Sequence, residues 1–122
     1  MKYLIEVDEE HLKALQLAAE VVARIGIGQV GEIARVVGNV RLPQELEKDL
    51  KKELHPELGQ GHYGIGNTKV REEANVLWDI YQVVRNRLAH DNLKPGEVPS
   101  FTVSFDSPMK TSNVDLIKIK KM

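Results

Sequence analysis

The sequence predicts a small α+β domain, in which four helices form the core and both chain ends build a small antiparallel sheet. Apolar residues recur every three or four positions between residues 8 and 92, as in amphipathic helices. Apolar and polar residues alternate over about 1–7, 100–106 and 113–120, which is typical of half-buried strands. The 122 residues fit one domain spanning 1–122.

The first helix is expected over about 9–25. Asp8 can cap it, and Glu9 and Glu10 place negative charge at the positive end of the helix dipole. The next six residues, 26–31, match the letters of the dinucleotide fingerprint GxGxxG. Because a helix precedes these glycines where the fingerprint needs a strand, we interpret them as a helix end and a bend.

Three further helices follow. The second is expected over about 29–37, the third over 44–54 directly after Pro43, and the last and longest over about 69–91, capped by Asn67 or Thr68. The chain's one tryptophan lies in the middle of the inward stripe of this last helix. That stripe comprises Val70, Ala74, Leu77, Trp78, Tyr81, Val84 and Leu88.

The stretch 55–67 holds four glycines and a proline, so it predicts a long loop. Its apolar members Leu58, Tyr63 and Ile65 indicate that it packs on the core. His62 and Tyr63 are candidate ligand-binding residues, and the alternative is a loop that only covers the core. Whether the loop acts as a lid is left open.

Overall charge and composition exclude several classes of protein. Seventeen basic and eighteen acidic residues leave a net charge of -1, so no general positive field draws the chain to nucleic acid or to a membrane. The chain has no cysteine, and its four histidines lack metal-ligand spacing. We therefore expect a cytoplasmic protein without metal, cofactor or membrane contact, and without a signal peptide or a membrane span.

Arg85 lies on the same seam of the last helix as Trp78 and Tyr81, so it needs a partner. The candidates are Asp79, a carboxylate of a partner subunit, or the phosphate of an anionic nucleotide. In the nucleotide case, the binding residues are Arg85, Arg87, His62 and Tyr63. Alternatively, Arg87 faces solvent.

The string from Arg85 to His90 fits Rx4H with the polar Asn86 after the arginine. In this respect it resembles the HEPN superfamily of helical-bundle RNA-processing nucleases and nucleotide-binding domains. The resemblance implies a metal-independent endoribonuclease acting across a dimer, with His90 as general base or acid, Arg85 as phosphate binder and Asn86 as orienting group. That family has a further helix after the motif, where proline, glycine and predicted strands follow here. The alternative for His90 is a helix-end residue near the last carbonyls.

A longer block resembles small uncharacterised proteins encoded by phages and prophages. It comprises residues 63–65, 73–74, 79–85 and 88–91. That group often has tryptophan at the position of His90, which implies a packing role. The resemblance implies an accessory protein that binds as a homodimer or higher oligomer, sequestering an anionic nucleotide or blocking a host protein in counter-defence, and located in the bacterial host cytoplasm. An exposed edge of the expected sheet would serve as the dimerisation surface.

Overall fold

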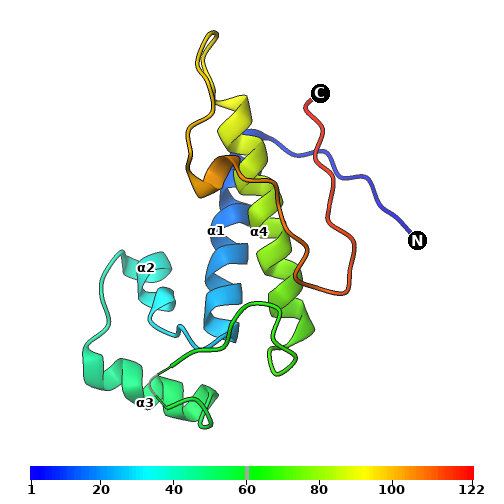
Figure 1. Ribbon diagram of the computed structural model, residues 1–122. Helices are drawn as coiled ribbons and strands as arrows, with labels where there is room; N and C mark the ends of the chain where they lie inside the picture. Colours follow the sequence, from blue (N-terminus) through cyan, green and yellow to red (C-terminus); the bar gives the residue numbers. More distant parts are fainter. Residues whose placement is uncertain (60) are drawn as a thin grey trace.

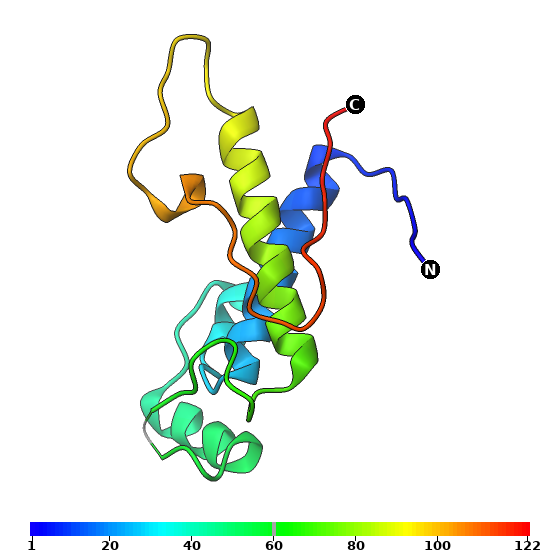
Figure 2. The same cartoon turned by 45° about the vertical axis from the view of Figure 1, so that its right-hand side comes forward.

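The computed structural model describes residues 1–59 and 61–122, and this part of the chain is all-helical. The elements are α1 (Glu9–Gly26), α2 (Glu32–Gly38), α3 (Gln44–Leu54), α4 (Glu72–Asp91) and the short 3-10 helix η1 (Val103–Phe105). Helices α1 and α4 lie side by side as a central pair (Figure 1). Helix α2 contacts α1, and η1 contacts α4. Figure 2 shows α3 beyond one end of that pair.

The predicted α+β class is wrong, because residues 1–59 and 61–122 contain no strand. Residues 1–7 are extended but exposed, and no backbone hydrogen bond pairs them with another segment among the described residues. Within 100–106 the chain instead forms η1. Residues 113–120 run over the surface without strand pairing. Alternation marks a possible apolar side, but a sheet also requires a neighbouring backbone, which these segments lack.

Two of the predicted helix starts are confirmed, and two need correction. Helix α1 begins after Asp8, whose N–H donates to His11 Nδ1 at 3.0 Å, and α3 spans the predicted residues. Helices α2 and α4 begin at Glu32 and Glu72 rather than near 29 and 69. Neither Asn67 nor Thr68 caps α4, which follows Arg71. The Asn67 side-chain oxygen instead accepts the N–H of Lys69 at 2.8 Å in the preceding turn.

Small residues let α1 and α4 approach closely. Ala19 and Ala23 of α1 and Ala74 of α4 are buried. A Cβ atom at Gly26, the last residue of α1, would lie 2.7 Å from Ala74 Cβ, so only glycine fits there. Gly28 then has a φ of 102°, in the left-handed region that glycine adopts without strain. The interpretation of 26–31 as a helix end and bend is confirmed.

The inward stripe of α4 and the packing of the loop are also confirmed. Five of the predicted stripe residues are buried, and Leu77 and Trp78 are half-buried. Ile27, Val70 and Ala74 form a cluster that Tyr63 and Ile65 cover. The Tyr63 N–H also donates to the Ile27 carbonyl at 2.8 Å. Gln60, within the predicted loop, lies outside the described residues.

A second stripe on α4 is polar, and it was not among the sequence-based predictions. We call it the α4 polar stripe; it comprises Asn75, Asp79, Gln82 and Asn86. The spacings of four and three residues place these side chains on one face. Three of the four are buried, which makes them expensive unless they are hydrogen-bonded.

The α4 polar stripe holds the C-terminal segment through backbone and hydroxyl groups. Asp79 accepts hydrogen bonds from the N–H and hydroxyl groups of both Thr111 and Ser112, over 2.6–3.0 Å. The Gln82 amide donates to the Met109 carbonyl at 2.8 Å and accepts the Met109 N–H at 3.2 Å. These bonds place residues 109–112 along α4 without a sheet.

Candidate functional site

A cavity of about 500 Å³ lies where the end of α1 and the following bend meet α3 and the end of the glycine-rich loop. Its volume is within the range of small-molecule sites. The lining residues are Arg24, Gly28, Gln29, Gly31, Glu32, Arg41, Leu42, Glu47, Lys51, Gly61 and His62. Most of these side chains are polar or charged, so the cavity favours a polar ligand.

Three of the lining cations differ in how they are held. Arg24 is fixed by Glu20 Oε2 at 3.1 Å and by Gln29 Oε1 at 2.9 Å. Lys51 donates to the Gly61 carbonyl and pairs with no carboxylate among the described residues. Arg41 has neither a hydrogen bond nor an ion pair within that part of the chain. Lys51 and Arg41 are therefore the cations that remain available to an anion.

The cavity contains one site residue that the sequence predicted and others that it missed. His62 lines the cavity, whereas Tyr63, Arg85 and Arg87 do not. Arg41, Lys51 and Glu47 were not singled out, because each stands in a segment of mixed charge that is typical of a solvated surface. They come together because Glu47 of α3 lies close to Gly31 of the bend.

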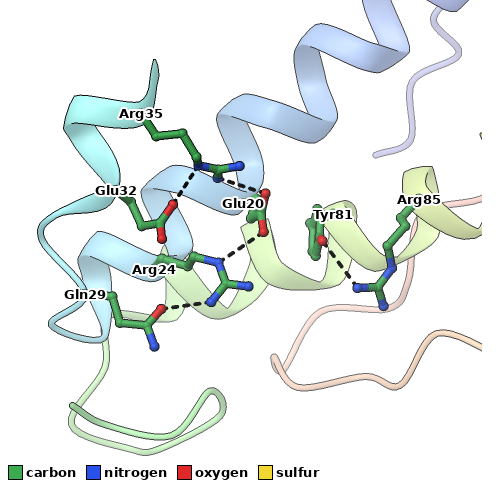
Figure 3. A network of polar contacts seen from close by, with 7 residues as sticks. All are labelled: Glu20, Arg24, Gln29, Glu32, Arg35, Tyr81 and Arg85. Carbon is green, nitrogen blue, oxygen red and sulfur yellow. Dashed lines mark hydrogen bonds and ion pairs between the residues drawn. The ribbon is translucent and has the colours of Figure 1, made fainter. Parts of the chain in front are cut away.

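An ion-pair network lies beside the cavity (Figure 3). Glu20 accepts from Arg24 and from Arg35 Nη2 at 3.0 Å, and Arg35 Nε also contacts Glu32 Oε2 at 2.8 Å. Burial raises the pKa of Glu20, but the hydrogen bonds and charges of Arg35 and Arg24 outweigh burial and leave the pKa below its ordinary value. The hydrogen bond to Glu20 raises the pKa of Arg35. This network joins α2 to α1 and fixes one wall of the cavity.

A ladder of cations and aromatic rings links this network to Arg85. The Arg24 guanidinium lies 5.3 Å from the Trp78 ring centroid, and the Trp78 and Tyr81 centroids are 4.9 Å apart. The Arg85 guanidinium lies 4.8 Å from the Tyr81 ring centroid and donates to the Tyr81 hydroxyl at 3.3 Å. Figure 3 shows the Arg85 guanidinium directed at Tyr81, on the side of Tyr81 opposite Arg24.

Arg85 therefore has a partner, but not the one predicted within the chain. Asp79 does not pair with Arg85, because the Asp79 carboxylate accepts hydrogen bonds from Thr111 and Ser112 instead. Among the described residues no carboxylate forms an ion pair with Arg85, and its buried Nε has no hydrogen-bond partner. The half-buried guanidinium is tolerated because it rests on an aromatic ring.

The other two residues of the Rx4H string contact η1 and its flanks. The Asn86 amide donates to the carbonyls of Ser104 at 3.3 Å and Asp106 at 3.1 Å. The His90 ring meets the Phe105 ring edge-on, with centroids 5.2 Å apart. Asn86 and His90 thus share a face of α4 that binds η1, whereas Arg85 lies on Tyr81.

The remaining predicted ligand residues have local partners. Arg87 does not simply face solvent, because it is half-buried and bonds Asp91 at 2.7 Å. The Tyr63 hydroxyl donates to Glu57 Oε1 at 2.8 Å, and this hydrogen bond raises the pKa of Tyr63. The His62 Nδ1 atom contacts its neighbour's carbonyl at 2.9 Å. The structure therefore places His62 in the cavity and gives Arg85, Arg87 and Tyr63 other surroundings.

Residues 1–59 and 61–122 contain neither a metal-binding cluster nor a membrane-spanning helix. No group of three or more histidine, aspartate or glutamate side chains in this part of the chain is placed to hold a metal ion. None of its helices combines the length and the apolar character that a bilayer span needs.

The fold and the cavity define a small helical protein built on one helix pair with an open polar cavity at its end. Comparison with protein-family models, curated proteins and solved structures finds no match to this chain.

Proposed function

We propose that the protein acts by binding, as a homo-oligomer, without catalysis of its own. The observation that supports this is the apolar surface that a single chain leaves uncovered. Residues 1–7, the N-terminal arm, include Leu4 at 101% and Ile5 at 76% exposed. On α1, Leu15, Ala18 and Val22 form an exposed stripe at spacings of three and four. We take these exposed apolar side chains as the proposed contact surface.

A second copy of the chain is the partner that the charges favour. Between residues 1 and 10 four acidic side chains outnumber one lysine, whereas residues 114–122, the C-terminal arm, carry three lysines and one aspartate. Both views place the chain ends on the same side of the helix pair (Figures 1 and 2). No ion pair joins the two arms among the described residues. The acidic end of one protomer therefore complements the basic end of another.

The biological setting is also a proposal. The resemblance of residues 63–91 to phage and prophage proteins supports a phage accessory protein. Blocking of a host protein in counter-defence would use the exposed apolar surface, and sequestration of an anionic nucleotide would use a cationic cavity. Both of these proposed roles rest on analogy with phage proteins and on the surfaces described above.

The metal-independent endoribonuclease stays as the second candidate, and one observation favours it. Arg85 is unpaired by any carboxylate in the described residues, as a phosphate-binding arginine would be. Against it, Asn86 and His90 are engaged by η1. RNA incubated with the protein in EDTA would be cleaved by the wild type and spared by His90→Ala under this candidate.

Removing the exposed apolar side chains of the arm tests the proposed function. We expect Leu4→Asp with Ile5→Asp to convert the oligomer to a monomer in sedimentation velocity, because each charge would be buried unpaired at the contact. Both side chains are exposed in the single chain, so the fold itself should be unaffected. Val98→Asp is the matched control, since Val98 is 82% exposed in the segment between α4 and η1. A wild-type chain that sediments as a monomer at every concentration would contradict the proposal.

A further inference from the structure

The cavity at the end of the helix pair presents two available cations and one available carboxylate. Arg41 and Lys51 line it without carboxylate partners among the described residues. Glu47 of α3 lines it too and forms no ion pair there. By contrast, Arg24 and Glu32 are neutralised by Glu20 and Arg35. The charges open to a ligand are therefore Arg41, Lys51 and Glu47.

Two glycines of the bend, Gly28 and Gly31, line the cavity, and Gly31 leaves room for the Glu47 carboxylate. A Cβ atom at Gly31 would lie 2.9 Å from Glu47 Oε1, so the absence of a side chain lets Glu47 lie against the bend. At Gly28 a Cβ atom would lie 2.5 Å from Leu58 Cδ1, which would have to move, and the φ of 102° strains any residue other than glycine. The bend thus keeps Glu47 beside the cavity and keeps the wall free of side chains.

These groups select the chemistry of a ligand. Guanidinium and ammonium groups recognise phosphate, and a carboxylate without a cation accepts hydrogen bonds from hydroxyl groups. A volume of about 500 Å³ is large for inorganic phosphate alone. A chain with a net charge of -1 lacks the general positive field that nucleic acid requires.

We propose that this cavity binds a small phosphorylated sugar, free or as part of a nucleotide, with its phosphate on Arg41 and Lys51 and its hydroxyl groups on Glu47. The inference rests on the proposed binding function and names its ligand class. It moves the anion site from Arg85 and Arg87 to the end of α1, and it retains His62 as a lining residue.

Calorimetric titration of the full chain with ribose 5-phosphate, adenosine monophosphate, adenosine and inorganic phosphate tests the proposal. Binding of both phosphorylated sugars, or of the nucleotide alone, supports it and distinguishes the two sources. Adenosine binding as tightly as its monophosphate would overturn it, and so would inorganic phosphate binding as tightly as ribose 5-phosphate. Absence of any binding would overturn it as well.

Single substitutions locate the site. We expect Arg41→Gln to weaken binding of adenosine monophosphate or ribose 5-phosphate about tenfold or more, as the loss of one charge-assisted hydrogen bond does. Arg41 is exposed and makes no hydrogen bond or ion pair within the described residues, so the substitution should not disturb folding. Lys51→Gln should act similarly. Lys52→Gln, the same change one residue along α3 and outside the cavity, should alter affinity by less than about twofold.

Two further variants separate this proposal from its alternatives. Arg85→Gln should leave the affinity unchanged, and a tenfold loss there would place the anion at Arg85 and overturn the cavity site. The doubly substituted arm variant should bind the ligand as a monomer. If the wild-type protein is an oligomer that binds none of these ligands, the cavity site is refuted and the homo-oligomer stands. If the wild-type protein is a monomer that binds the ligand, the homo-oligomer is refuted and the cavity site stands.

Discussion

At the scale of single residues, buried polar groups organise this molecule as much as apolar ones do. Asp79 is 4% exposed, and four donors from Thr111 and Ser112 surround its carboxylate. A buried carboxylate is tolerable only with such a set of donors. The C-terminal segment is therefore part of the fold rather than a tail.

Removal of that carboxylate should destabilise the whole chain. We expect Asp79→Ala to lower the free energy of unfolding by roughly 2–4 kcal/mol, because the donors of Thr111 and Ser112 lose their acceptor. Urea denaturation followed by circular dichroism measures the change. Asp115→Ala is the control, because the Asp115 side chain is fully exposed. Equal midpoints for the two variants would refute this role of Asp79.

Side-chain chemistry predicted only part of the candidate site. The need of Arg85 for a partner followed from its position among Trp78 and Tyr81, but the sequence could not show that Tyr81 itself fills that role. Asp79 was a plausible counter-charge from the sequence, but its carboxylate instead accepts a hydrogen bond from the Thr111 hydroxyl. Contacts separated by more than thirty positions leave no local pattern.

At the scale of elements, the helices were predictable from the sequence, whereas the absence of strands from the described residues was not. Helical spacing fixes which face of α1 and α4 is apolar, so a helix can be assigned without knowing its neighbours. Alternation in residues 1–7 and 100–106 specifies only one half of a sheet, since the other half is a partner backbone. In the C-terminal segment, Gln82 provides hydrogen bonds that a strand would have provided. The α4 polar stripe was the available signal for this arrangement.

The close approach of α1 and α4 gives a prediction with opposite signs at two helical glycines. Gly26→Ala should destabilise the chain by about 1–3 kcal/mol, because its Cβ would lie 2.7 Å from Ala74 Cβ. Gly38→Ala at the end of α2 should be neutral or stabilising by up to about 1 kcal/mol, since its nearest neighbour would be 3.5 Å away. Thermal unfolding of both variants checks the pair. Stabilisation by both would contradict the close packing.

At the scale of the whole molecule, the chain combines a small helical core with two terminal arms, one leading into the acidic start of α1 and the other basic. The arms contribute exposed apolar side chains and no backbone pairing among the described residues. A core of one helix pair buries few large side chains, with Val30 and Val84 the largest that are fully covered. Association with a second copy would remove further apolar surface from water.

Native mass spectrometry of the wild-type protein tests this account most directly. The account predicts ions at multiples of the 13.8 kDa chain mass, with an added mass of a phosphorylated ligand when one is supplied. Leu4→Asp with Ile5→Asp should return the spectrum to the single-chain mass. A wild-type spectrum that holds only the bare 13.8 kDa chain at every protein concentration would contradict the central claim that this protein works by binding as a homo-oligomer.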